Sequence, residues 1–255
     1  MSELKKTDSY VCIDLETTGL NPKTDRIIEI GAVKVENGCR TERFSSFVNP
    51  GRMLAEHITK LTGITDGQLR DAPDIAEILP EVMAFLGDAV LLGHSVLFDY
   101  SFIKKAAVNN RFAFERQGID TLKIARKFLP DLESRSLDFL CRHYEIPHKA
   151  HRALEDAEAT CMLYDRLWDA FGGNRSLTGD ASGGKRSLTR DAEKVFMPDK
   201  LIYHVKRETP ITPAQKERLY KLLERHKLNM GYDLDKLTRN EASRYTDQIL
   251  ARYGR

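Results

Sequence analysis

The chain has 255 residues, enough for one large domain or two modest ones, because domains usually run to roughly 100–200 residues. No apolar stretch approaches the ~20 residues needed to span a bilayer and no signal peptide opens the chain, so membrane proteins are excluded and we expect a soluble, cytoplasmic protein. The net charge of +2 hides a basic C-terminal third, since residues 174–255 hold 18 Lys and Arg against 11 Asp and Glu.

Strand-like apolar runs come first along the chain, and helical periodicity follows. Strands are predicted at Tyr10–Leu15, Ile27–Val35, Phe44–Val48 and Ala89–Leu92. Helices are predicted at Ile75–Leu86, Leu97–Val108, Leu137–Tyr144 and Ala153–Phe171. The Asn37-Gly38 pair is typical of a two-residue hairpin, so the early strands should be antiparallel. This order favours an α/β domain over residues 1–172 with one mixed sheet.

Residues 173–192 are predicted to form a flexible linker. The stretch repeats GG-x-RSLT after eleven residues, beginning at Gly172, and it has no apolar periodicity. A polar duplication of this kind is more often a spacer than a binding motif.

Residues 193–255 are expected to form a small basic helical domain. Thr212 and Thr238 each begin a capping-box sequence, with Gln215 and Glu241 three residues later, and apolar residues at helical spacing follow both. The positive charge of this tail is compatible with binding to phosphates, with a solvated helical face, or with docking to a protein partner. The sequence leaves these alternatives open.

The first candidate site is Asp14-Leu15-Glu16, at the end of the first predicted strand. Alternation along a strand places Asp14 and Glu16 on the same face. Two carboxylates side by side repel each other, so the pair requires a cation or a fully solvated face. Thr17 and Thr18 follow directly and supply hydroxyl and backbone donors next to the pair.

The second candidate site runs from His94 to Asp99, directly after the predicted strand Ala89–Leu92. A helix that begins near Leu97 places Asp99 in line with the apolar residues at i+3, i+4 and i+7. A carboxylate at the head of an apolar stripe requires a partner, unless Asp99 only stabilises the first turn of its helix.

The third candidate site is His151 to Asp156, at the start of the last helix of the first domain. Asp156 shares a face with Thr160, Leu163 and Leu167, so a carboxylate again stands where a leucine would be expected. His151 lies outside that stripe, which predicts a loop position from which it leans over the same cleft.

The strings IDLETTGL, GHSVLFD and HRALEDAEAT together resemble the three motifs of the DEDDh family of 3′–5′ exonucleases, which includes the proofreading subunits and domains of bacterial DNA polymerase III. The H-x4-D spacing between His151 and Asp156 matches the histidine branch of that family. The resemblance runs from about Tyr10 to Phe171, and one departure is Ser95, where the family commonly has asparagine. It implies a ribonuclease H-like fold, with a mixed five-stranded sheet flanked by helices, to which the tail adds a small C-terminal helical hairpin.

The resemblance also implies a two-metal-ion phosphodiester hydrolase. The carboxylates that would hold two Mg²⁺ or Mn²⁺ ions are Asp14, Glu16, Asp99 and Asp156, with Asp14 as the bridging ligand. His151 would take the proton from the attacking water. Thr17 and Thr18 would bind the terminal 3′ hydroxyl, Phe98 would stack at the terminal base and His94 would contact a phosphate, although Phe98 and His94 have packing roles as alternatives.

The expected substrate is the 3′ end of single-stranded DNA in proofreading or repair. The chain is too short to carry a polymerase as well, so proofreading would require a DNA polymerase subunit as a partner. Two alternatives stay open, namely an exonuclease on RNA or short oligonucleotides and a catalytically silent nucleic-acid-binding subunit.

Overall fold

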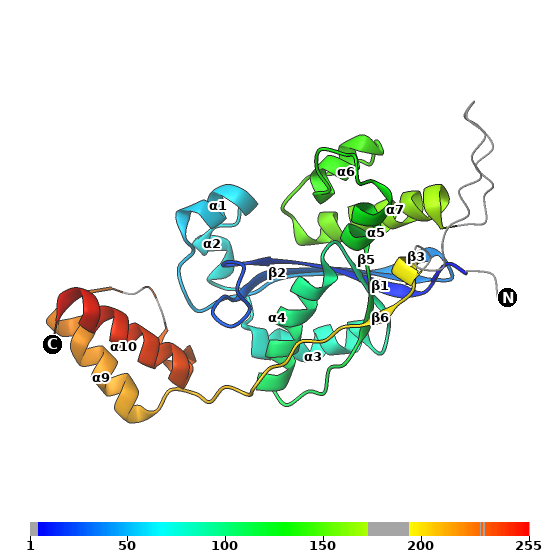
Figure 1. The fold of residues 1–255 in the computed structure, drawn as a ribbon. Helices are drawn as coiled ribbons and strands as arrows, with labels where there is room; N and C mark the ends of the chain where they lie inside the picture. Colours follow the sequence, from blue (N-terminus) through cyan, green and yellow to red (C-terminus); the bar gives the residue numbers. More distant parts are fainter. Residues whose placement is uncertain (1–4, 173–193, 230, 232, 255) are drawn as a thin grey trace, which may run out of the picture.

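A computed structural model of the chain describes residues 5–172, 194–229, 231 and 233–254. Its centre is a six-stranded mixed sheet in the order β3-β2-β1-β4-β5-β6 (Figure 1). The strands are β1 (Tyr10–Thr17), β2 (Ile27–Glu36), β3 (Cys39–Phe47), β4 (Leu91–Gly93), β5 (Gln117–Asp120) and β6 (Asp199–Lys200). Because β1 pairs antiparallel with β2 and parallel with β4, it lies in the interior of the sheet.

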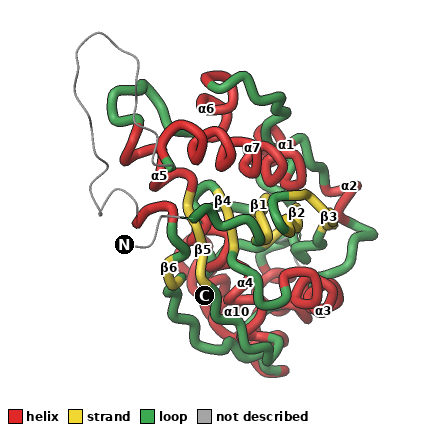
Figure 2. Tube along the Cα trace, turned by 90° about the vertical axis from the view of Figure 1, so that its right-hand side faces the viewer, coloured by secondary structure: helices red, strands yellow, loops and turns green. Residues whose placement is uncertain are grey.

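Helices cover both faces of the sheet (Figure 2). One face carries α5 (Thr121–Phe128), α6 (Leu137–His143) and α7 (Ala153–Phe171), and the other carries α3 (Ile75–Leu86) and α4 (Val96–Asn109). The short helices α1 (Glu56–Thr62) and α2 (Asp66–Leu69) follow β3. No described helix combines the length and apolarity that crossing a membrane requires.

Strand β1 is buried on both faces because its alternating side chains meet the two helical layers. Tyr10 and Cys12 belong to the core beneath α7, whereas Val11 and Ile13 belong to the core that α3 and α4 cover. Since side chains two residues apart point the same way, the row that begins with Tyr10 and Cys12 continues toward α7 after these apolar residues end. The first candidate site lies in this row.

The α/β fold predicted from the sequence is confirmed, with one more strand than expected. The helices at residues 75–86 and 153–171 have the predicted bounds. Asn37 and Gly38 both have positive φ, 51° and 78°, as a two-residue hairpin turn requires. The elements that the sequence did not predict are α1, α2, β5, α5 and β6. Strands β5 and β6 have four and two residues, too few for alternation to be visible.

The segment that follows the expected linker packs on the first domain. Phe196 is 1% exposed and lies edge-on to Trp168, with ring centroids 5.3 Å apart. Leu201 joins the core beside α4, and its N–H donates to the carbonyl oxygen of Arg116 at 3.0 Å. The linker predicted at residues 173–192 lies outside the described residues.

The tail then forms the predicted hairpin of α9 (Pro213–Arg225) and α10 (Arg239–Tyr253). Both predicted capping boxes are present, with Thr212 and Thr238 as the N-caps. The two helices enclose a small core of their own, whose buried members are Leu219, Leu222, Leu237, Tyr245 and Ile249.

The packing of Phe196 and Leu201 predicts that two truncations will differ in stability. Deleting residues 174–255 removes both side chains from the core of the first domain, and we expect it to lower the free energy of unfolding by at least about 3 kcal/mol. Deleting residues 207–255 keeps both and should cost much less. Urea unfolding of the two truncated proteins measures the difference, and equal midpoints would show that residues 194–206 add nothing to the core.

Candidate metal centre

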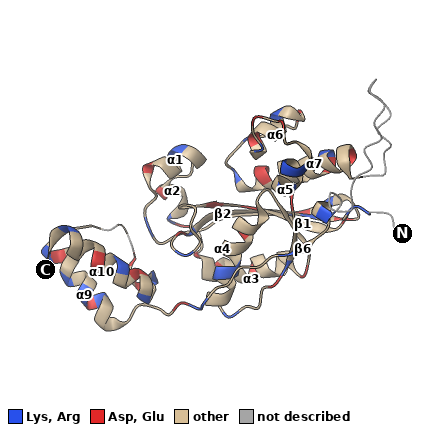
Figure 3. Cartoon of the chain, viewed as in Figure 1, with Lys and Arg blue, Asp and Glu red and all other residues tan. Residues whose placement is uncertain are grey.

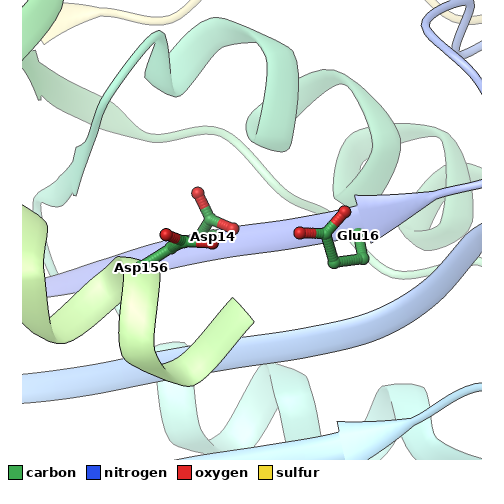
Figure 4. A group of neighbouring side chains, drawn as sticks. All are labelled: Asp14, Glu16 and Asp156. Atoms are coloured by element: carbon green, nitrogen blue, oxygen red, sulfur yellow. The ribbon is translucent and has the colours of Figure 1, made fainter. Parts of the chain in front are cut away.

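Three carboxylates from two distant segments meet at the end of β1. Asp14 and Glu16 stand on the strand, and Asp156 comes from the first turn of α7 (Figure 4). Each offers a carboxylate oxygen, and these oxygens all lie within 4.8 Å of one another. The pair expected on one face of β1 and the third carboxylate on α7 are therefore brought together as the sequence predicted.

Asp99 approaches the same place from the opposite helical layer. It stands in the first turn of α4 and is 3% exposed, and its Oδ1 accepts a hydrogen bond from the backbone N–H of Leu15 at 3.1 Å. Leu15 lies between Asp14 and Glu16, so this bond ties α4 to the strand that carries them. The partner that a carboxylate at this position requires is thus a backbone amide of β1.

The N-terminus of α7 reaches the sheet because β2 offers a glycine and a carboxylate there. Gly31 pairs with Asp14 across the strands, and a Cβ on Gly31 would lie 2.1 Å from the backbone of Ala153. Glu29, 1% exposed, forms an ion pair with Arg152 at 2.9 Å and accepts a hydrogen bond from the N–H of Ala153 at 3.2 Å. Sequence analysis missed these residues, since nothing local in β2 indicates which helix will lie on it.

The carboxylates strongly favour each other's protonation. Burial, followed by the charges of Asp99, Asp156 and Glu16, holds the pKa of Asp14 well above its usual range. Burial also raises the pKa of Asp99, Asp156 and Glu16, the last to about 7, with Asp156 and Glu29 adding to the effect on Glu16. Repulsion of this kind is relieved when a cation binds, and an all-oxygen set suits a hard divalent ion. The residues present therefore fit a divalent metal.

The two histidines next to α7 are arranged differently from the expectation. His151 is in the loop, as predicted, but its side chain is exposed, its φ is 68°, and its contact with Asp156 is a hydrogen bond from its backbone N–H at 3.0 Å. The imidazole that faces Asp156 belongs to His148, whose Nε2 contacts Oδ1 of Asp156 and whose side chain is 4% exposed. Sequence analysis missed His148, although its place three residues before His151 could have suggested it.

Two of the predicted substrate-binding residues, His94 and Phe98, differ in how their side chains are packed. His94 has both ring nitrogens engaged, since Nε2 donates to the carbonyl oxygen of Arg135 at 2.8 Å and Nδ1 lies 2.9 Å from Oγ1 of Thr121. Burial lowers its pKa. Phe98 is half-buried, with its ring centroid 5.0 Å from that of Phe102. These contacts favour the packing alternative for His94 and leave one side of Phe98 accessible.

Thr17 ends β1, and Thr18 begins the loop between β1 and β2. The hydroxyl of Thr17 donates to the carbonyl oxygen of Gly19 at 2.7 Å. Thr18 is joined to Arg26 twice: its N–H donates to the carbonyl oxygen at 2.8 Å, and its Oγ1 accepts from the N–H at 3.0 Å. The loop is therefore closed at its two ends directly beside Glu16.

The raised pKa of Glu16 predicts how stability depends on pH without divalent ions. Between pH 4.5 and about 7 the folded protein keeps a proton on Glu16 that the unfolded chain has already released. Stability should therefore fall as pH rises through this window, by on the order of 2 kcal/mol. Thermal melts in EDTA from pH 5 to 8 measure this slope, and Glu16→Gln should flatten it. Adding Mn²⁺ should raise the melting temperature more at pH 8 than at pH 5; an unchanged slope in Glu16→Gln would contradict the assignment.

The α/β sheet thus carries, at the end of a central strand, clustered carboxylates that could hold a divalent metal. A model of the exonuclease family, RNase_T, matches residues 11–164. The chain belongs to this exonuclease family, whose members hydrolyse nucleic acid, and the resemblance recognised in the three motifs is confirmed.

Relatives and solved structures agree with this assignment. The chain is 39% identical to the DNA polymerase III subunit epsilon of Aquifex aeolicus over 170 residues, which are 64% of this chain and 84% of that protein. It is 42% identical over 168 residues to the DNA polymerase III PolC-type of Caldanaerobacter subterraneus and 33% identical over 249 residues to that of Oceanobacillus iheyensis, covering 65% and 95% of this chain. The matched residues make up only 12% and 17% of those two long polymerases.

Among solved structures, exonuclease I has a similar fold, with a TM-score of 0.56 at 19% identity over 65% of this chain and 43% of that one. Exonuclease X in complex with 5′ overhanging duplex DNA gives a TM-score of 0.51 at 24% identity, over 63% of this chain and 91% of that one. At these identities the likeness concerns the fold, which is the ribonuclease H-like arrangement expected from the sequence.

Proposed function

We propose that this chain is a metal-dependent 3′–5′ exonuclease that acts on DNA in proofreading or repair. The observation that supports it most is the meeting of Asp14, Glu16 and Asp156 within 4.8 Å, with Asp99 bonded to the same strand. The direction and the DNA substrate are suggested by the epsilon subunit, which matches over most of its length. We further propose that residues 1–172 form the catalytic domain, completed by residues 194–206, and that the helical unit begins after them.

The four carboxylates would hold two Mg²⁺ or Mn²⁺ ions, with Asp14 as the bridging ligand. Carboxylate oxygens prefer such hard ions to Zn²⁺, which is more often bound through nitrogen and sulfur. When bound, two such ions would supply activation of the attacking water and relief of negative charge on the phosphate and the leaving 3′ oxygen. Burial of Asp99 and Asp156 keeps competing water away from the acidic groups and strengthens their attraction for cations.

His151 is proposed to accept the proton of the attacking water. Its position in a loop and its exposed side chain allow the imidazole to turn toward a bound phosphate, while its N–H keeps the loop attached to Asp156. His148 would act on the same carboxylate from the other side and orient it. General base catalysis requires contact within about 3 Å in the substrate complex, and catalytic contacts are often longer without substrate.

The 3′ end of the DNA strand is proposed to bind beside β1. Thr17 and the backbone of Thr18 would bind the terminal 3′ hydroxyl, and Phe98 would stack on the terminal base, since base stacking on aromatic rings is tolerant of sequence. His94 is the weakest of the four candidates, because a phosphate contact would replace one of its two hydrogen bonds.

The proposed partner is a DNA polymerase subunit, and the proposed location is the cytoplasm. One of the relatives is a subunit of DNA polymerase III, and another is a DNA polymerase III of the PolC type. The hairpin would meet such a partner through charged outer faces, because Leu219 and Leu222 are buried within it. Lys and Arg are intermixed with Asp and Glu on α9 and α10 (Figure 3), and Lys216 and Lys221 form ion pairs with Asp235 and Glu217. This mixture favours a protein partner over a phosphate backbone.

Product ladders test the proposed activity. The protein is incubated with Mg²⁺ and with 5′-labelled single-stranded DNA, mismatched duplex DNA or RNA of the same sequence. We expect shortening one nucleotide at a time from the 3′ end of DNA, inhibited by EDTA. Release of the label as a mononucleotide from the start would indicate degradation from the 5′ end and would contradict the proposal, as would full activity in EDTA. Faster shortening of RNA than of DNA would favour the RNA alternative.

A further inference from the structure

The C-terminal hairpin contacts the exonuclease domain beside the loop that leaves β1. Residues 18–26 form this loop, which begins directly after Thr17. Two main-chain hydrogen bonds and one ion pair join the hairpin to neighbouring segments: Met53 to Gly231 (3.1 Å), Asp233 to Gly51 (3.1 Å) and Lys236 to Asp74 (3.0 Å). The hairpin is thus attached to the domain at several points.

Glu241 is the central group of this contact. It lies in the first turn of α10, is 3% exposed, and accepts hydrogen bonds from Nη2 of Arg26 at 2.8 and 2.9 Å and from Nη2 of Arg52 at 2.9 Å. Although burial opposes ionisation, Arg26 and Arg52 hold the pKa of Glu241 below its usual range. A buried carboxylate between two guanidinium groups is costly to break from either side, because the remaining charges lose their partner.

The two arginines connect Glu241 to the loop. Arg52 donates through Nη1 to the carbonyl oxygen of Thr24 at 3.1 Å. Arg26 is itself the last residue of the loop. Its carbonyl oxygen accepts from the N–H of Thr18 and its N–H donates to Oγ1 of Thr18, which closes the loop beside Glu16. The position of Thr18 therefore depends on residues that Glu241 holds in place.

A second attachment supports the same loop from the other side. Nζ of Lys105, on α4, donates to the carbonyl oxygen of Lys23 at 2.9 Å and lies 3.3 Å from the carboxylate of Glu208. Glu208 belongs to the segment that leads into the hairpin, and its N–H is bonded to the side chain of Asn109 at 2.9 Å. Glu208 thus acts through Lys105 on Lys23, and Glu241 acts directly on Arg26. The C-terminal part therefore supports both ends of the stretch from Lys23 to Arg26.

We propose that Glu241 is a positioning residue for the 3′-terminal nucleotide. It holds Arg26 and Arg52 in place, and these two arginines hold the loop of residues 18–26. The inference rests on the proposed function, in which Thr17 and Thr18 bind the strand end. A loop already held in one conformation loses less freedom when the substrate binds. The hairpin therefore contributes to substrate affinity and leaves the chemical step at the carboxylates unchanged.

Two variants release the loop from opposite sides. Glu241→Gln removes the charge but keeps the helix cap, because glutamine also serves at the third position of a capping box. Arg52→Gln removes the bond to Thr24 and leaves the hairpin sequence intact. Two controls match them: Thr238→Ala removes the capping hydroxyl, which also donates to Oε2 of Glu241 at 3.1 Å, but keeps Glu241 and both arginines, and Asp247→Asn removes an exposed charge from the same helix.

Hydrogen exchange and steady-state kinetics on the full chain provide the two measurements. In Glu241→Gln and Arg52→Gln, peptides that cover residues 18–26 should exchange faster, while peptides of β2 and α7 keep the wild-type rate. KM for a single-stranded DNA should rise roughly tenfold, as expected when the binding-competent conformation falls to about a tenth of the molecules, with kcat unchanged. Thr238→Ala and Asp247→Asn should match the wild type in both measurements.

Three results would overturn the proposal. Wild-type exchange of residues 18–26 in both test variants would show that Glu241 does not hold the loop. Faster exchange with an unchanged KM would show that the loop does not bind the strand end. An equal rise of KM in Thr238→Ala would assign the effect to the helix cap. If the wild-type protein degrades no nucleic acid, the proposed function fails, whereas the exchange measurement still decides whether Glu241 positions the loop.

Discussion

Asp99→Asn should lower the rate of DNA degradation by more than roughly 10³-fold while the protein stays folded. The asparagine keeps an oxygen that can accept the hydrogen bond from the N–H of Leu15, so the link between α4 and β1 survives. What is lost is one negative charge among four neighbouring carboxylates, and with it part of the attraction for a divalent cation. Single-turnover kinetics with saturating Mn²⁺ and single-stranded DNA measure the loss.

The melting temperature of Asp99→Asn shows whether Asp99 is a metal ligand or a carboxylate that only supports the fold. Removing a charge that its neighbours repel should leave the melting temperature of Asp99→Asn in EDTA unchanged or higher. Asp120→Asn is the control, since Asp120 is also buried and its charge also acts on Asp99, but its own oxygen caps α5 and accepts the N–H of Ser95 at 2.9 Å. We expect this control to keep activity within about tenfold of wild type. Near-wild-type activity of Asp99→Asn would refute the metal-binding role.

His151→Ala should lower the chemical step by roughly 10²–10⁴-fold, the usual contribution of a general base, with little effect on stability. The side chain is exposed, so its removal opens no cavity, and the N–H that binds Asp156 is retained by alanine. Calorimetric titration of Mn²⁺ should show that metal affinity is largely kept. Rapid-quench kinetics on a short oligonucleotide measure the step itself.

A variant of His148 tests whether His151, and not His148, is the general base. His148→Ala removes the imidazole that contacts Asp156 and should act mainly by weakening metal affinity, by roughly 10–100-fold, because it disturbs the orientation of a ligand. Excess Mn²⁺ should therefore restore much of the activity of His148→Ala and none of that of His151→Ala. If the opposite pattern is found, the proton is transferred through His148 and the assignment based on the H-x4-D spacing is wrong.

Much of the fold was predictable because its main elements are long and strongly patterned. The helix at residues 153–171 shows its buried face over five turns, and the β2–β3 hairpin is marked by Asn37-Gly38. Strand β5 was missed because four residues contain little periodicity. Helix α5 is amphipathic, but its eight residues are fewer than the roughly 11–18 over which helical periodicity is read. Strand β6 was missed because its two residues form a strand only through their pairing with β5.

The sequence by itself predicted which carboxylates form the candidate site. Asp99 and Asp156 were predicted as site residues because a carboxylate on an apolar stripe is unfavourable without a partner, and Asp14 and Glu16 because two carboxylates on one face of a strand repel each other. Both properties can be read from spacing. Only the tertiary structure decided which histidine faces Asp156, how Gly31 and Glu29 receive the start of α7, and how Glu241 holds the loop after β1. These contacts join residues as far apart in the chain as Arg26 and Glu241. Local periodicity carries no information about them, because they form only when separately folded segments pack against one another.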